Sequence, residues 1–397
     1  MRKRILIATA VFPPEPVVSS KISSDLADSL INEGHSVIVV SPMPTRPAGY
    51  KFNFKETRTK RYRHIITDSY VCPESHILGR FRESVSFGKA VSRIIKEEHA
   101  SIDVIYANVW PIFSQWYIAR TAKKYGIPYC IHVQDIYPEQ LCQKVNKVIG
   151  IILKTILLPI DKYVLKNANK VIAISEEGGN YLLRTRGLID SCRMCVVRNW
   201  QDDEAFRNAY APVKHKAEKM TFMFVGTINP TVNMEFIIDA FSRVDRDKYT
   251  LSIVGSGVKK EECMKLCDKL SIPCSFSVVT AEEVPEKQQD ADVLVLSLLS
   301  GVAKTATPSK LTAYMFSGRP ILACVDKDSD TAAIIKDSKC GIVADPMDQS
   351  ELVEVINSFV NMTNEELNTM GVSGMEMAKK RLSKEKNLSD LTRIVIN

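Results

Sequence analysis

The sequence predicts two doubly wound α/β domains, and three observations support this fold class. The chain has 397 residues, too many for one ordinary domain and suitable for two. Short apolar runs typical of strands alternate with amphipathic helical segments along the chain. A polar stretch at residues 207–219 interrupts this alternation once. We therefore expect one domain at 1–205, a second at 206–375, and a charged helix at 376–397 that packs back on the first domain.

The first domain opens with a βαβ unit. An apolar run at 4–11 predicts a strand, the spacing of apolar residues at 19–32 predicts a helix, and 36–40 is a second strand. Such a unit implies a parallel sheet with helices on both faces. The pattern continues with strands at 103–106, 129–133 and 170–174 and helices at 114–125 and 176–185.

A second series of strands and helices follows the polar stretch. Strands are expected at 222–225, 251–254, 275–279, 293–296 and 320–325, and helices at 234–241, up to 270, at 309–316 and at 331–336. In open α/β sheets ligands bind beyond the carboxyl ends of the strands. The loops that follow the strands are therefore where we look for function.

Composition and cysteine usage exclude several classes of protein. Hydrophobic residues make up 45% and charged residues 25%, which argues against disorder and fibrous repeats. The ten cysteines lie scattered in apolar stretches, as expected of buried thiols in a reducing cytosol. Only Cys192 and Cys195 have zinc-ligand spacing, so we expect no metal site. No run reaches the roughly 18 apolar residues of a membrane span.

Charge divides unevenly along the chain. Residues 1–200 hold 29 Lys and Arg against 17 Asp and Glu, a net charge of +12, whereas the rest holds 24 against 29, a net charge of −5. A basic half joined to a slightly acidic half indicates that the halves meet different partners, one of them anionic.

Polar residues gather after the strand at 129–133. Within eight residues, His132, Gln134, Asp135, Tyr137 and Glu139 place an imidazole and two carboxylates at the end of an apolar strand. Burying so many polar groups is costly, which favours function over a lone core histidine. Phe12-Pro-Pro-Glu15 puts another carboxylate, that of Glu15, beyond the first strand, where a rigid turn is an equally good explanation.

The second domain carries candidate phosphate-binding features. Glycine turns follow two of its strands, Gly226-Thr227 and Gly255-Ser-Gly257, although glycine also follows strands for steric reasons alone. Ser309 is a good helix N-cap, and a helix N-terminus attracts anions. Two lysines, at 304 and 310, flank Pro308, and a lysine in a first helical turn opposes the helix dipole unless it has an anionic partner.

These motifs, in this order, resemble those of family 4 retaining glycosyltransferases over nearly the whole chain, and the WbuB-like branch in particular, which adds amino-deoxy sugars in bacterial surface-polysaccharide assembly. The motifs that carry the resemblance are Phe12-Pro-Pro-Glu15, His132-Val-Gln-Asp135-Ile-Tyr-Pro-Glu139, Val171-Ile-Ala-Ile-Ser175-Glu176, Arg198-Asn199, Phe224-Val-Gly226, Val254-Gly-Ser-Gly257 and Pro308-Ser-Lys310-Leu-Thr-Ala-Tyr314-Met-Phe-Ser-Gly318-Arg-Pro320.

The resemblance implies a GT-B fold of two Rossmann-like domains, with a nucleotide-diphosphate sugar on the second domain and an acceptor on the first. It implies a catalytic site at His132 and Asp135 and no metal cofactor, because amides and lysines stabilise the leaving phosphate. Donor-binding residues would be Gly226, Thr227, Gly255, Gly257, Lys304, Pro308, Ser309, Lys310 and Tyr314, and acceptor-side residues Glu15 and Glu139.

The sequence departs from the family pattern at several positions. Two glutamates usual in the family are replaced by Thr305 and Ala313, so the ribose contact must come from elsewhere, for which we consider Tyr314. Thr227 and Val232 stand where Arg and Lys are frequent. The usual Gly-Gly after the first strand is Val17-Val18.

Two basic segments of the first domain indicate an anionic acceptor. Residues 46–64 interleave seven Lys and Arg with aromatic residues. This pattern suits single-stranded nucleic acid, but in this context a lipid diphosphate or phospholipid surface is more economical, and a solvated loop is the alternative. Residues 144–170 alternate lysines with Val, Ile and Leu, which predicts a helix in the membrane interface, with a core helix pair as competitor.

The sequence thus predicts a glycosyltransferase without metal or other cofactor, peripheral on the inner face of the cytoplasmic membrane. It would move a sugar from a nucleotide-diphosphate donor, expected to be a UDP-sugar, to a lipid-linked saccharide, and would bind no nucleic acid. A non-catalytic glycosyltransferase-like binding subunit is the alternative, and a nucleotide-sugar epimerase ranks last because the basic segments would have no role in it.

Overall fold

The computed structural model describes residues 2–15, 17–44, 61–72, 77–109, 111–142, 145–187, 190–200, 203–213, 219–280, 282–302 and 309–397. The chain divides into two compact units, which we call the first unit (Met1–Asn199 with Asn387–Asn397) and the second unit (Trp200–Lys386). The division falls ahead of the expected boundary at 205. Val197 still donates to Ala173 of the first sheet (2.9 Å), whereas helix α7 (Asp203–Ala209) contacts helices of the second unit.

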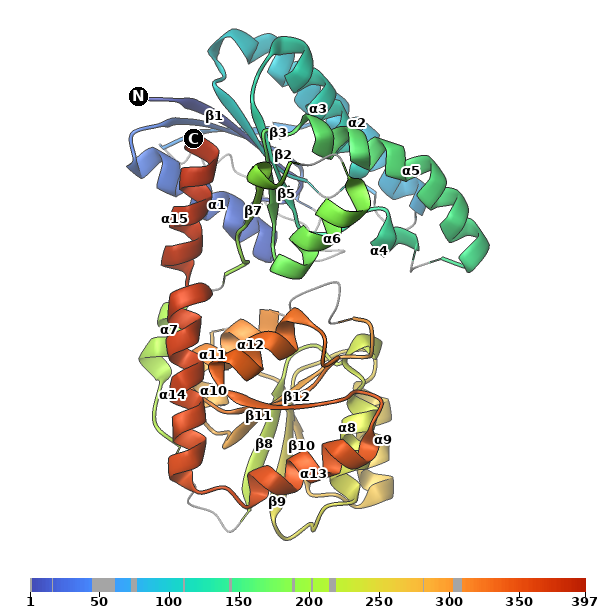
Figure 1. Cartoon of the computed structure of the whole chain (residues 1–397), viewed down its shortest axis with the longest axis vertical. Coiled ribbons are helices and arrows are strands. Elements are labelled where there is room, and N and C mark those ends of the chain that lie inside the picture. Colours follow the sequence, from blue (N-terminus) through green and yellow to red (C-terminus); the bar gives the residue numbers. More distant parts are fainter. Residues whose placement is uncertain are drawn as a thin grey trace. The chain divides into compact units, whose positions relative to one another are not determined.

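The first unit contains a parallel sheet of seven strands among the described residues, in the order β3-β2-β1-β4-β5-β6-β7 (Figure 1). The strands are β1 (Arg4–Thr9), β2 (Ser36–Pro42), β3 (Arg63–Thr67), β4 (Val104–Asn108), β5 (Tyr129–Val133), β6 (Lys170–Ala173) and β7 (Met194–Val196). Strand β3 begins at the end of the basic segment 46–64, of which residues 46–60 lie outside the described part.

Helices cover both faces of this sheet. Apolar residues of α2, α3 and α5 form one core with Leu6, Ile38 and Ile105, while α1 packs on the opposite face, where Ser23 contacts Thr9. The helices are α1 (Val18–Asn32), α2 (Ile77–Glu98), α3 (Ile112–Tyr125), α4 (Glu139–Cys142), α5 (Lys147–Asn167) and α6 (Glu176–Arg186), with short 3₁₀ turns η1 (His99–Ser101) and η2 (Ser191–Arg193). Sequence reasoning did not anticipate α2.

The second unit repeats this architecture with a parallel sheet in the order β10-β9-β8-β11-β12-β13. Its strands are β8 (Met220–Val225), β9 (Tyr249–Val254), β10 (Cys274–Ser277), β11 (Val293–Ser297), β12 (Ile321–Cys324) and β13 (Gly341–Ala344). Alternate strand residues enter two different cores, as expected of a sheet buried on both faces.

Helices α8 and α13 contribute to one of these cores, and α11 and α12 to the other. The elements are η3 (Pro230–Val232), α8 (Met234–Ser242), α9 (Lys260–Leu270), α10 (Val284–Gln288), α11 (Ser309–Phe316), α12 (Asp330–Ser338) and α13 (Gln349–Val360). The expected helices of this half all occur, with boundaries shifted by a few residues.

The C-terminal segment forms two helices instead of the expected single helix at 376–397. Helix α14 (Asn364–Arg381) packs in the second unit, where Ala378 and Leu382 are buried. Helix α15 (Lys384–Ile396) follows, and from Asn387 onward it belongs to the first unit. There Thr392 contacts Ser29 of α1 (2.9 Å), and the ammonium of Lys3 bonds the carbonyl of Ile396. At the break, the hydroxyl of Ser383 accepts from the amide of Lys386 (3.3 Å) and so caps the start of α15.

Both sheets have a point where the strand order reverses. It falls between β1 and β4 in the first unit and between β8 and β11 in the second. Ligands of doubly wound proteins bind beyond the carboxyl ends of the strands at these points. No helix among the described residues has the length and apolar character needed to cross a bilayer.

Candidate active site

His132 is the penultimate residue of β5 and is buried, with 1% of its side chain exposed. Its Nδ1 lies 2.6 Å from the hydroxyl of Tyr106 on the neighbouring strand β4. Burial lowers the pKa of His132 to about 3. The imidazole is therefore neutral at physiological pH, and Tyr106 fixes its orientation.

Several buried polar atoms at the carboxyl edge of the first sheet have no hydrogen-bond partner among the described residues. They are Nε2 of His132, Nε2 of Gln134, Oδ1 of Asn108 and Oδ1 of Asn199. The Asn199 side chain already donates to Oε1 of Gln134 (2.8 Å), so these two residues, which follow β7 and β5, lie in contact. Buried polar groups are normally paired. Unpaired bonding capacity on neighbouring strands therefore indicates a place where a polar ligand fits.

Glu139 lies elsewhere than expected of an acceptor-binding carboxylate. Its two oxygens accept from both terminal nitrogens of Arg186 (3.0 and 2.8 Å), and one also accepts from the hydroxyl of Tyr181 (3.0 Å). Although burial opposes it, these hydrogen bonds hold the pKa of Glu139 below its usual value. The carboxylate is engaged within the protein, and its assignment to the acceptor stays a prediction.

The other two carboxylates lie after strands, as predicted. Glu15 follows β1 and is buried at 5% exposure. Asp135 follows β5 and is partly exposed; partial burial raises the pKa of Tyr137, and the charge of Asp135 raises it further. Asp135 is therefore the more accessible of the two.

Lys310 is the main candidate residue at the carboxyl edge of the second sheet. It lies in the first turn of α11, with its ammonium 5.3 Å from the centre of the Phe224 ring on β8. Burial lowers its pKa, and no carboxylate among the described residues pairs with it. Position in a first helical turn adds the unfavourable field of the helix dipole. A buried cation in this setting is stabilised by an anion.

Gly226 and Lys310 are in direct contact. Gly226 follows β8 with φ +145°, and a Cβ placed there would overlap the end of the Lys310 side chain. Glycine is therefore required for the lysine to lie across the end of β8. Strand β8 borders the point where the strand order reverses. The residues expected from the sequence and the position expected from the topology therefore coincide at the end of β8.

Two amides of the glycine turns are already bonded within the sheet. The amide of Gly226 donates to Val254 and that of Gly255 to Ser277, both at 2.8 Å. A Cβ on Gly255 would meet the carbonyl of Gly226, and one on Gly257 the carbonyl of Ile228. These two glycines allow the loops after β8 and β9 to pack closely. Thr227, which follows Gly226, is exposed.

Tyr314 does not hold a ribose. It is fully buried, and its hydroxyl donates to the carbonyl of Val225 (3.1 Å) while accepting from the amide of the same residue (2.9 Å). Burial raises the pKa of this phenol further. The assignment of Tyr314 to donor binding is therefore wrong, and the residue joins α11 to β8.

Other expected residues are placed in part. Ala313 and Val232, which replace charged residues of the family pattern, are buried in the two cores of the second unit. Lys304, Thr305 and Pro308 lie outside the described residues, and Ser309 begins α11.

Sequence reasoning missed Asp326, which lies after β12. Its two carboxylate oxygens accept from the hydroxyl of Ser300 (2.8 Å) and the amide of Gly301 (2.7 Å). It thereby anchors the loop after β11, the start of the segment that leads to α11. The signal available was a lone aspartate at a strand end, which does not stand out from others in the chain.

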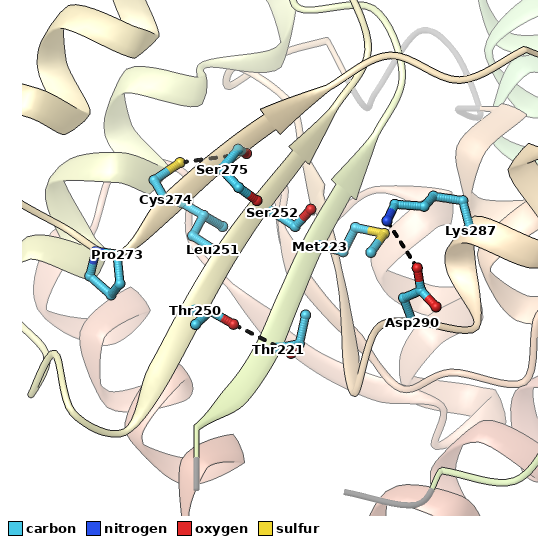
Figure 2. A pocket seen from close by; sticks show the side chains of 10 residues that line it. All are labelled: Thr221, Met223, Thr250, Leu251, Ser252, Pro273, Cys274, Ser275, Lys287 and Asp290. Carbon is cyan, nitrogen blue, oxygen red and sulfur yellow. Dashed lines mark hydrogen bonds and ion pairs between the residues drawn. The ribbon is translucent and has the colours of Figure 1, made fainter. Parts of the chain in front are cut away.

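A cavity of about 510 Å³ opens on the second sheet at β8, β9 and β10 (Figure 2). Hydroxyl-bearing side chains such as Thr250 and Ser252 line it, and the paired Lys287 and Asp290 lie at one side. None of the predicted site residues lines this cavity. We therefore place the candidate site at the carboxyl ends of the strands and not here. Among the described residues, no cluster of His, Cys, Asp and Glu suits a metal ion.

Comparison with solved structures defines the class of fold. The chain matches sucrose-phosphate synthase of Thermosynechococcus elongatus with a TM-score of 0.73 at 14% identity, covering 99% of this chain and 98% of that one. HepE of Anabaena in complex with UDP gives 0.70 at 14%, covering 98% of each chain, and the lipopolysaccharide glycosyltransferase WaaG gives 0.66 at 14%, covering 98% and 99%. The protein has the GT-B fold.

Family models then identify the protein more closely. Residues 22–205 match the model "Glycosyltransferase Family 4" and residues 219–362 the model "Glycosyl transferases group 1", so the chain belongs to the glycosyltransferases. A curated relative, the probable glycosyltransferase WbjE of Pseudomonas aeruginosa, is 22% identical over 252 residues, which span 60% of this chain and 61% of that protein. The alignment thus spans about three fifths of the relative's length.

Proposed function

We propose that this glycosyltransferase moves a sugar, an N-acetylated amino sugar, from a UDP-linked donor to a lipid-linked saccharide acceptor in bacterial surface-polysaccharide assembly. The reaction retains configuration, as in the WbuB-like branch that the motifs resemble. UDP is present in a structural relative, HepE, and WaaG acts in lipopolysaccharide biosynthesis. O-antigen or capsule assembly on the inner face of the cytoplasmic membrane is the corresponding setting.

Lys310 is the observation that carries the donor half of this proposal. A desolvated ammonium without a carboxylate partner, at the reversal point of the second sheet, is suited to a diphosphate. As the sugar leaves, charge develops on the departing phosphate, and a preorganised cation stabilises that charge. We assign Lys304, Pro308 and Ser309 to the same site.

In the first unit we assign acceptor chemistry to His132 and Asp135. With its pKa near 3, His132 remains neutral and acts through hydrogen bonding from Nε2 and not by donating a proton at neutral pH. Asp135, the accessible carboxylate, orients or activates the acceptor hydroxyl. Glu15 lies on the acceptor side, after β1.

A membrane surface is the proposed partner of α5. The N-terminal half of this helix exposes a set of apolar side chains that includes Val148 (69%), Ile149, Ile151 (60%), Ile152 and Ile156. Its later residues Leu157, Val164 and Leu165 are buried, so the core interpretation applies to that half. Exposed apolar residues flanked by lysines favour binding at an anionic interface, to which each lysine adds about 1 kcal/mol. We assign the basic segment 46–64 to the same surface or to a lipid diphosphate.

Sedimentation with anionic vesicles tests the membrane proposal. Changing Lys147, Lys154 and Lys162 to glutamate should release the protein into the supernatant. A control variant carries the same changes at Lys260, Lys265 and Lys269 of α9 in the second unit, so that net charge is matched, and should sediment like the wild type. Equal sedimentation of both variants would reject α5 as the membrane-binding helix.

Donor and transfer are tested in sequence. A thermal-shift screen with UDP-, GDP- and dTDP-sugars identifies the nucleotide, since a specific ligand raises stability by mass action. Transfer to a polyprenyl-diphosphate-linked acceptor is then measured for His132→Ala and Lys310→Ala. Both variants should lose transfer, and full activity in both would refute the site assignment.

Burial of Ala313 in an apolar core favours one second candidate, a non-catalytic binding subunit, because the family carboxylate at this position is absent. Such a subunit would bind a nucleotide sugar and yet release no nucleotide with any membrane-derived acceptor. Release of UDP with one acceptor would exclude it.

A further inference from the structure

Arg186, the last residue of α6, is buried to 1% exposure and uses all five of its N–H donors. Nε donates to Asp161 on α5 (2.5 Å), and Nη1 to Glu139 (3.0 Å) and to the hydroxyl of Thr185 (2.9 Å). Nη2 donates to Glu139 and to the carbonyl of Tyr137, both at 2.8 Å. A guanidinium has five such donors, so this side chain has no remaining bonding capacity.

These bonds fix one end of the loop that connects β5 to α4. The loop leaves β5 after Val133 and enters α4 at Glu139. Arg186 holds the backbone at Tyr137 and the side chain of Glu139 at the far end. At the near end, by contrast, Nε2 of His132 and Nε2 of Gln134 are buried without a partner among the described residues. Asp135 lies between the saturated end and the unsatisfied end.

Packing alone does not require these charges. Burying a guanidinium and two carboxylates costs desolvation energy, and apolar residues of similar volume often join helices as well or better. Burial raises the pKa of Asp161 to about 6, against the attraction of Arg186. What the fork of a guanidinium adds is fixed geometry towards several partners at once.

We propose that Arg186 is a positioning residue for sugar transfer, which holds the loop 134–139 so that Asp135 meets the acceptor. This inference rests on the proposed function. Asp161 and Glu139 act with Arg186 as one anchor, drawn from α5, α4 and α6. In this proposal Glu139 affects the acceptor only through the position of Asp135, and does not contact the acceptor itself.

A double-mutant cycle on the transfer rate tests this proposal in the full-length protein. Asp135→Asn should lower kcat about 100-fold or more, as removal of a catalytic acid or base does. Arg186→Lys keeps the charge but loses the fork, and should lower kcat on the order of 10-fold by misplacing the loop. If Arg186 acts through Asp135, the double variant will stay within about twofold of Asp135→Asn alone.

The proposal is overturned if the losses in kcat of the two single variants multiply in the double variant. A merely structural arginine would lower kcat by the same factor whether or not Asp135 is present. The KM for the nucleotide sugar should not change, since the donor is assigned to the second unit. Arg319→Lys is the matched control: Arg319 is equally buried and donates to the carbonyls of Ala211 and Gln289 in the second unit. Its effect should multiply with that of Asp135→Asn.

If Arg186→Lys does not fold, Glu139→Gln replaces it in the same cycle, because it weakens the anchor from the other side and keeps the side chain's shape. Asp135→Asn without effect on transfer would also overturn the proposal, as there would be nothing to position. Failure of the proposed function itself has a different signature, the absence of transfer by the wild-type protein with every lipid-linked acceptor.

Discussion

Two buried cations, one in each unit, differ in how they are neutralised. Arg186 in the first unit meets two carboxylates, a hydroxyl and a backbone carbonyl, and every one of its donors is used. Lys310 in the second unit meets an aromatic ring and the backbone at Gly226, and no described carboxylate. Both side chains carry one positive charge, Arg186 fully buried and Lys310 partly buried, but only Lys310 lacks a charged partner among the described residues.

This difference distinguishes a cation that anchors the fold, Arg186, from one that is available to a ligand, Lys310. Burial and perturbed pKa values occur in both places, so neither property alone marks a functional site. The partners differ: all five donors of Arg186 are used, whereas Lys310 has no carboxylate partner among the described residues. Removing the saturated cation should therefore cost stability, and removing the unsatisfied one should cost affinity.

Arg186→Met should produce the largest effect, a loss of about 3–5 kcal/mol in the free energy of unfolding, because it leaves Asp161 and Glu139 buried without a counter-charge. Urea denaturation followed by circular dichroism measures it. Adding Asp161→Asn and Glu139→Gln to Arg186→Met should restore much of the loss. A loss below about 1 kcal/mol in Arg186→Met would show that the network is not an anchor.

Lys310→Met should weaken UDP binding about 10- to 100-fold, the value of a charge-assisted hydrogen bond of about 1.5–3 kcal/mol, without lowering the stability of the ligand-free protein. Titration calorimetry with UDP measures the affinity. Lys287→Met serves as control, since Lys287 belongs to the same unit and is paired with Asp290. Equal affinities for the two variants would contradict the assignment of Lys310 to the diphosphate.

Gly226→Ala sharpens the comparison within the second unit. The new Cβ would overlap Lys310 at a backbone φ of +145°, which alanine rarely adopts, so we expect a stability loss of about 1–3 kcal/mol together with weaker UDP binding. Gly126→Ala, at φ +67° with open space around it, should lose stability and leave UDP binding unchanged. Unaltered UDP affinity in Gly226→Ala would show that Lys310 does not need a glycine at position 226 in order to bind UDP.

The NMR titration of His132 should show the smallest change, none between pH 5 and 8. Its pKa of about 3 in the folded protein lies below the ordinary 6.5, so the unfolded chain takes up the proton first. The contribution of His132 to the free energy of unfolding is therefore complete above pH 6.5 and is lost as the pH falls towards 3. NMR of the ring protons should show no titration of His132 between pH 5 and 8, with His132→Gln for assignment. A midpoint near 6.5 would refute burial of the ring.

The periodic apolar pattern was sufficient to predict the α/β fold, because buried parallel strands are short apolar runs that local sequence reveals. Residues tied to such strands were predicted well in position: His132, Asp135 and Gly226 follow or end the strands expected. Helix α2 was missed although its buried residues Phe87, Val91 and Ile95 recur at helical spacing.

What local sequence could not reveal is which groups are already satisfied. Glu139 and Arg186 lie 47 residues apart, so their pairing has no local signal. Tyr314 follows Lys310 by one helical turn, yet α11 is buried almost all round, so its sequence shows no polar face from which the direction of the hydroxyl could be judged. The same holds for the amides of Gly226 and Gly255, whose partners come from neighbouring strands.

The most direct test of this account is the rise in thermal stability that UDP produces in three proteins: wild type, Arg186→Met and Lys310→Met. Scanning calorimetry with and without UDP measures it. We predict that Arg186→Met melts earlier than the wild type but keeps the UDP-induced rise of the second unit, whereas Lys310→Met melts like the wild type without UDP and loses that rise. An undiminished rise in Lys310→Met would contradict the central claim that this lysine's unused charge marks the donor site.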